Sequence, residues 1–212
     1  MTVSRLGTVT GVVRPYRGVS ADERRTERRQ RLVTACLDLV GEGGVSTVTA
    51  QAVAERAGLT RRYFYESFAD RDAVLVEALD GMFSTLGGDI RTALRTAGDA
   101  PLDRARATIQ LLIATMDDPR VARLYVEAPG HPALQARREQ AIHSYTRLLA
   151  EEVLGLGRDD PRTELAALIL VAGITHAVTS WLAGHIALGR EELIEEIVRL
   201  SVAATATPVQ RP

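Results

Sequence analysis

Apolar residues recur at three- and four-residue intervals along almost the whole chain of 212 residues, and no stretch alternates steadily between apolar and polar residues. Three- and four-residue spacing gathers apolar side chains on one face of an α-helix, whereas a half-buried strand needs a two-residue alternation. The pattern therefore predicts an all-α protein with about nine helices.

Start and stop signals define the first helix. Ser20 and Glu23 have the spacing of a capping box, in which each residue satisfies a free backbone amide at a helix start. Gly43 and Gly44 follow the last apolar position and favour an end there. We expect a helix over about residues 21–41, with a charged first half and an apolar face on its second half.

Two short helices follow. Thr49 is a candidate N-cap for the first of them, which Gly58 ends. Thr60 is expected to cap the second, over about residues 61–68. Two helices joined by a tight turn that contains glycine have helix-turn-helix spacing.

The remaining signals divide the rest of the chain into longer helices. Asp70 is expected to cap a fourth helix that continues to the glycine pair Gly87 and Gly88. Asp118 and Pro119 open another helix, because proline tolerates the first helical position. The other expected helices span about 102–116, 132–154, 162–188 and 190–204.

Residues 58–68, GLTRRYFYESF, hold four of the nine aromatic residues of the chain. On a helix, Phe64 and Phe68 are four residues apart and face the same way. We expect this pair to pack on Val53, Ala57 and the apolar face of the first helix. The remaining side chains then project outward: Arg61, Arg62, Tyr63 and Tyr65.

These outward side chains have the chemistry that a DNA-binding helix uses. The first turn of the second helix of a helix-turn-helix meets base edges in the major groove. Arg61 and Arg62 can donate to guanine O6 and N7 or hold a phosphate, and the Tyr65 hydroxyl can reach a phosphate. The alternative is a solvated arginine pair on a purely structural helical hairpin, and the spacing alone leaves both open.

The distribution of charge favours a nucleic-acid partner. Residues 1–72 carry 12 Arg against 9 acidic residues, whereas residues 73–212 carry 14 against 18. A basic N-terminal part is attracted to a polyanion. Residues 1–19 read as a flexible basic arm that either enters the minor groove or remains a disordered tail. Its candidate groove contacts are Arg5, Arg14 and Arg17.

The segment TVTAQAVAERAGLTRRYFYESFADRDAVLVEAL, residues 47–79, resembles the DNA-binding segment of TetR-family transcriptional repressors. Together with the first helix, the resemblance covers about residues 28–80. Arg62 and Tyr63 are bulkier than the residues common at these positions in the family, which suggests an operator sequence of its own. The positions that match are Val53-Ala54, Ala57-Gly58, Leu59-Thr60, Tyr65 and Phe68, with Arg71 in place of a common Lys.

The resemblance implies a regulator that binds double-stranded operator DNA as a homodimer and is released by a small-molecule effector. It assigns residues 20–70 to a helix-turn-helix DNA-binding domain and 71–206 to an effector-binding and dimerisation domain, with 207–212 as a tail. The residues expected at the DNA are Thr49, Gln51, Thr60, Arg61, Arg62, Tyr63, Tyr65 and Arg71.

Residues 165–188 contain no charged side chain. A membrane span is one interpretation, but small and polar residues crowd the second half, so we favour a helix that is covered on all sides and expect no membrane partner. One chain of this size offers too few neighbours for such a helix, which predicts a two-fold dimer. The candidate interface residues are Ala172, Gly173, His176, Thr179, Ala183, Leu193 and Ile197.

The large domain is expected to hold a small, largely apolar effector. The fourth helix begins in the DNA-binding unit and continues into the large domain, so it is the expected lever between effector and operator. Plain core packing is the alternative for each candidate pocket residue. These candidates are Met82, Tyr125, Tyr145 and Trp181.

The sequence shows no sign of catalysis. None of the four His residues has Glu three positions before it, as a helical di-iron site requires, and no phosphate-binding, nucleophile or cysteine metal motif occurs. We expect a protein that is not an enzyme and that has no cofactor and no metal; a helical interaction module is the other rival. The single Cys36 on an apolar face and the lack of a signal peptide predict a cytoplasmic setting.

Overall fold

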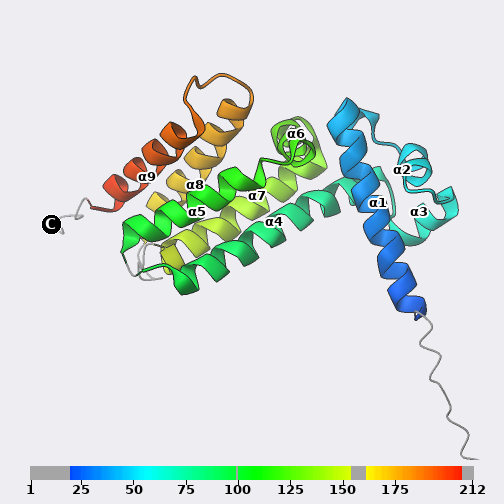
Figure 1. Ribbon diagram of the computed structural model, residues 1–212, viewed down its shortest axis with the longest axis horizontal. Coiled ribbons are helices and arrows are strands. Elements are labelled where there is room, and N and C mark those ends of the chain that lie inside the picture. Colours follow the sequence, from blue (N-terminus) through cyan, green and yellow to red (C-terminus); the bar gives the residue numbers. More distant parts are fainter. Residues whose placement is uncertain (1–19, 99, 154–160, 207–212) are drawn as a thin grey trace, which may run out of the picture.

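The computed structural model describes residues 20–98, 100–153 and 161–206, and in this part of the chain it contains nine α-helices and no strand (Figure 1). The all-α prediction is confirmed. The predicted arm, 1–19, and tail, 207–212, lie outside the described residues. The helices are α1 (Ala21–Gly43), α2 (Ala50–Arg56), α3 (Arg61–Ser67), α4 (Arg71–Thr96), α5 (Pro101–Thr115), α6 (Pro119–Glu127), α7 (Pro132–Leu148), α8 (Pro161–Leu182) and α9 (Arg190–Ala206).

Helix α1 begins at the predicted capping box. The Ser20 hydroxyl accepts a hydrogen bond from the Glu23 amide at 3.0 Å, and the Glu23 carboxylate accepts one from the Ser20 amide at 2.6 Å. The helix ends at Gly44, whose φ of +84° lies in a region that favours glycine. A 3₁₀ turn at Val45–Thr47 then leads to α2.

The three N-terminal helices share a small core. Helix α3 packs on both α1 and α2 at one end of the molecule (Figure 1). Phe64 is fully buried and Phe68 is 3% exposed, as predicted from their shared helix face. They join Leu32 and Val53, which are also buried, and the Arg29 guanidinium lies 4.2 Å from the centre of the Phe68 ring. These contacts set the orientation of α3 on α1 and α2.

Helix α4 runs beyond the glycine pair at which it was expected to stop. It continues through Gly87 and Gly88 to Thr96. A glycine inside a helix costs about 1 kcal/mol relative to alanine, and burial of Ile90 and Leu94 beyond the pair offsets this cost. Gly87 also admits α7, because a Cβ atom there would lie 3.4 Å from the Tyr145 hydroxyl.

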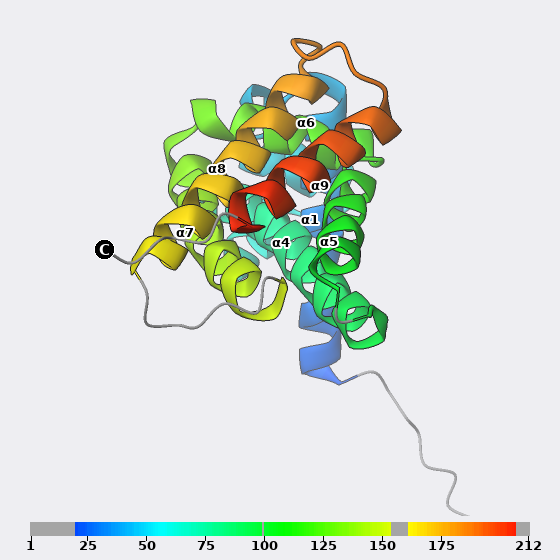
Figure 2. The same ribbon diagram turned by 90° about the vertical axis from the view of Figure 1, so that its left-hand side faces the viewer.

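Helices α4 to α9 form the larger part of the molecule (Figure 2). Helix α4 packs on α5 and α7, and these pack in turn on α9 and α8. A short contact between α8 and α9 closes the arrangement, which surrounds an internal space. The helix expected over 132–154 continues from α7 through a π-helical turn at Leu149–Val153. The end expected at 188 was wrong: α8 ends at Leu182, and Gly184 beyond it adopts a φ of +78°.

The outer face of α8 is exposed in the isolated chain. Leu165 is 57% exposed and Ile169 is 62% exposed, so one chain alone does not cover this helix, in line with the expectation that a single chain offers it too few neighbours. Among the described residues, α8 is the one helix long and apolar enough to cross a membrane, with a mean hydropathy of 1.8. One such helix is weak evidence for a span, since a packed helix of a soluble protein meets the same criteria.

Replacing Phe64 by Ala tests the core of the three-helix unit. Phe64→Ala leaves a cavity between α1, α2 and α3, so we expect the free energy of unfolding to fall by about 3–5 kcal/mol. Tyr65→Ala is the matched control, because Tyr65 is 52% exposed on the same helix and its loss should cost less than about 1 kcal/mol. Urea unfolding followed by circular dichroism measures both; equal losses would contradict this packing.

Candidate nucleic-acid interface and internal cavity

The eight residues predicted to contact DNA are all exposed in the structure. They come from α2, α3, the turn between them and the start of α4, at the end of the molecule away from α9 (Figure 1). Their exposure leaves them free for an external partner. They are Thr49, Gln51, Thr60, Arg61, Arg62, Tyr63, Tyr65 and Arg71.

The two arginines on α3 are each paired along the helix with a residue four positions later. Arg61 donates to the Tyr65 hydroxyl at 3.2 Å, and its guanidinium lies 5.7 Å from the Tyr65 ring centre. Arg62 donates through Nε to Glu66 at 2.8 Å. The Arg62 side chain is nevertheless 85% exposed.

Several of the predicted residues also have structural roles. The Thr49 hydroxyl accepts from the Ala52 amide at 3.1 Å and so caps α2. Arg71 pairs with Asp72 at 3.2 Å and reaches the Val48 carbonyl at 3.5 Å. Thr60 was expected to cap α3 with its side chain, and that expectation is wrong: Thr60 begins the helix with its backbone alone.

The structure places two further arginines beside this surface that the sequence analysis did not single out. Arg25 and Arg28 of α1 line a small cleft together with Glu66 and Ser67 of α3. The Arg28 guanidinium lies 4.9 Å from the ring centre of Tyr63. The charged first half of α1 was the available signal, but its neighbour in space could not be read from the chain.

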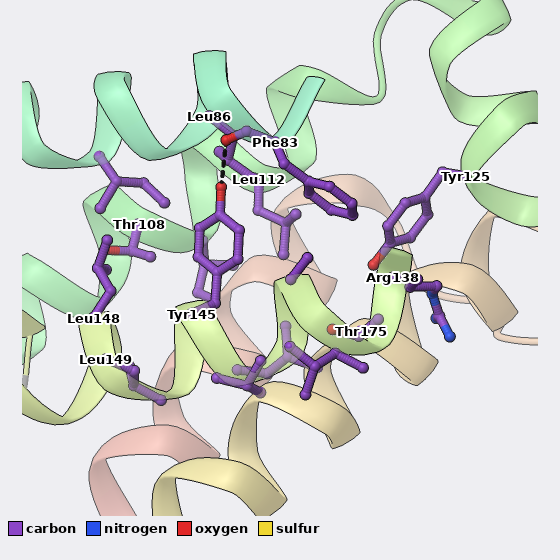
Figure 3. A pocket seen from close by; sticks show the side chains of 16 residues that line it. Phe83, Leu86, Thr108, Leu112, Tyr125, Arg138, Tyr145, Leu148, Leu149 and Thr175 are labelled. Carbon is purple, nitrogen blue, oxygen red and sulfur yellow. Dashed lines mark hydrogen bonds between the residues drawn. The ribbon is translucent and has the colours of Figure 1, made fainter. Parts of the chain in front are cut away.

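The large domain contains an internal cavity between α4, α5, α6, α7 and α8 (Figure 3). The cavity has a volume of about 80 Å³, and its wall is almost entirely apolar. Its polar groups include the hydroxyls of Tyr125, Tyr145, Thr108 and Thr175 and the guanidinium of Arg138. Most of the wall therefore offers only apolar contacts to a bound compound.

Two of the four predicted pocket residues line this cavity and two do not. Tyr125 and Tyr145 form part of the wall, on α6 and α7. Met82 is buried but is not part of the wall, whereas the next residue of α4, Phe83, is. Trp181 is also absent from the wall, because it lies in the last turn of α8 and donates through its indole nitrogen to the Leu188 carbonyl at 2.9 Å. Both expectations are corrected.

The two cavity tyrosines are held in defined positions. The Tyr145 hydroxyl donates to the Phe83 carbonyl of α4 at 2.7 Å, and burial raises the pKa of Tyr145 to about 12. Burial also raises the pKa of Tyr125, although the neighbouring Arg138, Thr175 and Thr179 oppose that rise. Both hydroxyls therefore stay protonated at neutral pH and act as hydrogen-bonding groups.

Helix α6 joins the large domain to the end of α1. The Val45 amide donates to Glu127 at 2.7 Å, and Arg123 donates to Glu127 at 2.8 Å. Gly44 must be glycine at this junction, because a Cβ atom would lie 2.7 Å from the Glu127 carboxylate. The same Arg123 donates to the Gly41 carbonyl at 3.1 Å.

A second set of charges strengthens this junction. Arg120 of α6 bridges two carboxylates, with Asp38 of α1 at 2.6 Å and Asp118 at 2.7 Å. The hydrogen bond from Arg120 is the main reason that the pKa of Asp118 lies below its usual value. Because α6 also carries Tyr125, one helix contacts both the cavity and α1.

The predicted dimer-interface residues are buried, half-buried or exposed in the structure. Leu193 and Ile197 are 3% and 6% exposed, because they face inward on α9, which packs against α5 of the same chain. Their assignment to the interface is corrected. Thr179 is half-buried and accepts from Arg138 at 3.2 Å. The exposed members, all from α8 or directly after it, are Ala172, Gly173, His176 and Ala183.

Potential metal ligands are dispersed over the part of the chain that the structure describes. In this part, no group of three or more His, Cys, Asp or Glu residues lies close enough together to hold a metal ion. Cys36 is buried in the core, and burial raises the pKa of its thiol to about 12. This thiol stays protonated and shielded at neutral pH.

The sequence profile described as "Bacterial regulatory proteins, tetR family" matches residues 32–78. The curated relatives of this chain are transcriptional regulators as well. The HTH-type transcriptional regulator BetI of Stenotrophomonas maltophilia is 27% identical over 179 residues, which cover 77% of this chain and 84% of that protein. BetI of Burkholderia thailandensis is 29% identical over 122 residues, 58% of each chain.

Solved structures share the whole fold. A TetR-family regulator described as putative, from Syntrophomonas wolfei, superposes with a TM-score of 0.72 at 17% identity and covers 88% of this chain and 99% of its own. The fatty acid degradation regulator FadR of Bacillus halodurans gives 0.69 at 16% identity, with 87% and 97% covered. The multidrug binding protein EbrR, complexed with imidazole, gives 0.65 at 22%, with 87% and 98% covered.

A helix-turn-helix unit on a larger helical domain defines a DNA-binding transcriptional regulator. The profile match over residues 32–78, the relatives and the shared fold all support a regulator of the TetR family. They agree with the resemblance seen in the sequence. These relatives are named as transcriptional regulators.

Replacing Glu127 tests the junction between α6 and α1. Glu127→Ala leaves the Val45 amide and Arg123 without their acceptor, so we expect the free energy of unfolding to fall by about 1–3 kcal/mol. Glu139→Ala, which removes an exposed carboxylate from α7, should change it by less than about 0.5 kcal/mol. Urea unfolding measures the difference, and a junction that contributes nothing would give the same value for both variants.

Proposed function

We propose that this protein is a cytoplasmic repressor that binds operator DNA as a homodimer and leaves the operator when a small molecule fills the internal cavity. The observation that carries the proposal is the sorting of side chains on α3. Phe64 is fully buried, whereas Arg61 and Arg62 on the same helix are exposed. A helix fixed on one side and cationic on the other fits the recognition helix of a helix-turn-helix.

The proposed DNA contacts follow from the geometry of α3. Arg61 and Arg62 stand in its first turn, where side chains reach base edges in the major groove. A guanidinium donates two hydrogen bonds to guanine O6 and N7, while phosphate contacts set the position of the protein on the duplex. We assign phosphate contacts to Tyr65 and to Arg25 and Arg28, which flank α3 on α1.

The proposed homodimer covers the exposed face of α8. Leu165, Ile169, Ala172 and His176 follow one another at three- and four-residue spacing and are all exposed. Soluble monomers rarely leave such a contiguous apolar stripe in water. A two-fold contact buries the same stripe on both chains and places the two α3 helices to read half-sites about one DNA turn apart.

In the proposed effector response, two helices connect the cavity with the DNA-binding unit. Helix α4 contributes Phe83 to the cavity wall and begins beside α3, as the sequence suggested. Helix α6 contributes Tyr125 to the wall and Glu127 to the contact with Val45, a second connection that sequence reasoning did not find. A ligand that repositions α4 or α6 shifts the population of conformations that fit the operator.

The solved structures support the kind of effector. One is described as a fatty acid degradation regulator, and another is a multidrug binding protein complexed with malachite green. Malachite green is a cationic dye with a large aromatic body, and the cavity of this chain has a mainly apolar wall. The effector proposed here is accordingly a largely apolar compound.

Removing one arginine from α3 tests the DNA-binding surface. Against an operator selected from random DNA, Arg62→Ala and Arg61→Ala should each weaken binding by about 1–3 kcal/mol, because each removes a paired contact with a base. Arg147→Ala removes an exposed arginine from α7 and should leave the affinity unchanged. Fluorescence anisotropy at fixed salt measures the three affinities; wild-type affinity in both α3 variants would overturn the proposal.

A charge on the outer face of α8 tests the dimer. Ile169→Glu places a carboxylate in the proposed apolar contact, so sedimentation velocity at micromolar concentration should show a dimer for the wild type and a monomer for the variant. Leu102→Glu is the control, since Leu102 is 45% exposed on α5, away from that face. A monomeric wild-type protein, or a variant that dimerises normally, would refute this interface.

A further inference from the structure

We propose that the cavity binds amphipathic carboxylates, compounds with an apolar body and one carboxylate group, and that Arg138 pairs with the carboxylate. This inference rests on the proposed function, in which the cavity is the effector site. It adds the charge of the effector and the residue that selects it.

The body of the cavity selects for an apolar compound. Leu86 and Ile90 of α4, Leu112 of α5 and Ile174 of α8 face the same space. Among the described residues of the wall, none is acidic, and Arg138 is the one charged residue. A bound compound that carried its own positive charge would meet no counter-charge there.

Arg138 lies at one end of the cavity, beside the Tyr125 hydroxyl and Thr175, whereas Leu148 and Thr108 lie at the other end (Figure 3). Its guanidinium is 5.4 Å from the ring centre of Tyr125 and donates to the Thr179 hydroxyl at 3.2 Å. Its Nε atom is buried and has no hydrogen-bond partner within the described part of the chain. The positive charge of the wall therefore lies at one end of the cavity.

The arginines near Arg138 are paired with carboxylates, whereas Arg138 pairs with none that the structure describes. Arg137, the preceding residue, forms an ion pair with Asp80 of α4. Arg91, on α4 beyond Tyr145, lies 3.8 Å from a Glu152 oxygen. Over the residues that the structure describes, Arg138 has no carboxylate within ion-pair distance. Of these three arginines, Arg138 is the one that no carboxylate of the described residues pairs with.

An uncompensated, half-buried cation favours an anionic ligand. Arg138 has lost part of its hydration, and a buried donor without a partner costs free energy in the empty protein. A ligand carboxylate accepts two charge-assisted hydrogen bonds from the planar guanidinium. The Tyr125 hydroxyl, which interacts with Thr175 and Thr179, lies beside the guanidinium. An organic cation of the same shape is repelled by the same group.

Matched probes separate the charge of the ligand from its shape. Decanoate, decanol and decylamine share one apolar chain, and naphthoate and naphthol share one ring system. Isothermal titration calorimetry on the full chain without DNA, at neutral pH, gives the dissociation constants. We expect at least one carboxylate to bind about tenfold or more tightly than its neutral twin, a difference of about 1.4 kcal/mol, and decylamine to bind most weakly.

Variants of two α7 arginines test whether Arg138 causes the preference for carboxylates. Arg138→Gln should reduce the preference for the carboxylate over its neutral twin to less than about twofold, and Arg138→Lys should retain part of it. Arg147→Gln removes the same charge from an exposed position of α7 and should keep the full preference. Binding of the neutral probe by Arg138→Gln shows that the variant has a folded cavity.

The outcomes distinguish this inference from the function on which it rests. Equal binding of both carboxylates and their neutral twins, no binding by either carboxylate, or an unchanged preference in Arg138→Gln would overturn the inference. Operator release is measured separately by anisotropy. If another class of compound releases the operator, the inference alone fails. If a carboxylate binds through Arg138 but leaves operator affinity unaltered, the effector response fails and the inference stands.

Discussion

Burial of Phe64 and Phe68 against α1 and α2 is the constraint on which the proposed DNA-binding surface depends. A helix as short as α3 has little stability of its own, so tertiary packing must hold it in place. Because the two rings take one face, Arg61 and Arg62 are left on the solvent side. One apolar contact thus supplies both the rigidity of the helix and the direction of its charges.

Helix α6 of the large domain likewise has one part that is fixed against α1 and another that lines the cavity. Glu127 and Arg120 of α6 bind Val45 and Asp38, at the end of α1, with hydrogen bonds of 2.7 and 2.6 Å. Tyr125 of the same helix lines the cavity. A ligand larger than the present space must move part of the wall. Since α4 and α6 both extend from that wall to the DNA-binding unit, such a movement cannot remain local.

The sequence was sufficient where neighbouring residues decide the structure. Spacing along one helix predicted that Phe64 would be buried and Tyr65 exposed, and capping residues located most helix starts. It was insufficient where distant segments meet. Glu127 accepts a hydrogen bond from Val45 across 82 positions, and Leu193 is buried where α9 packs against α5 of the same chain. Gly87 likewise looked like a helix end, because its contact with Tyr145 is visible only in three dimensions.

The central claim is that α3 occupies the major groove, and protection of purines from dimethyl sulfate tests it most directly. This reagent methylates guanine N7 in the major groove and adenine N3 in the minor groove. With a selected operator, the account predicts that the bound protein protects guanine N7 in two patches about 10 base pairs apart. Protection confined to adenine N3, or guanine N7 atoms that react as they do in free DNA, would contradict it.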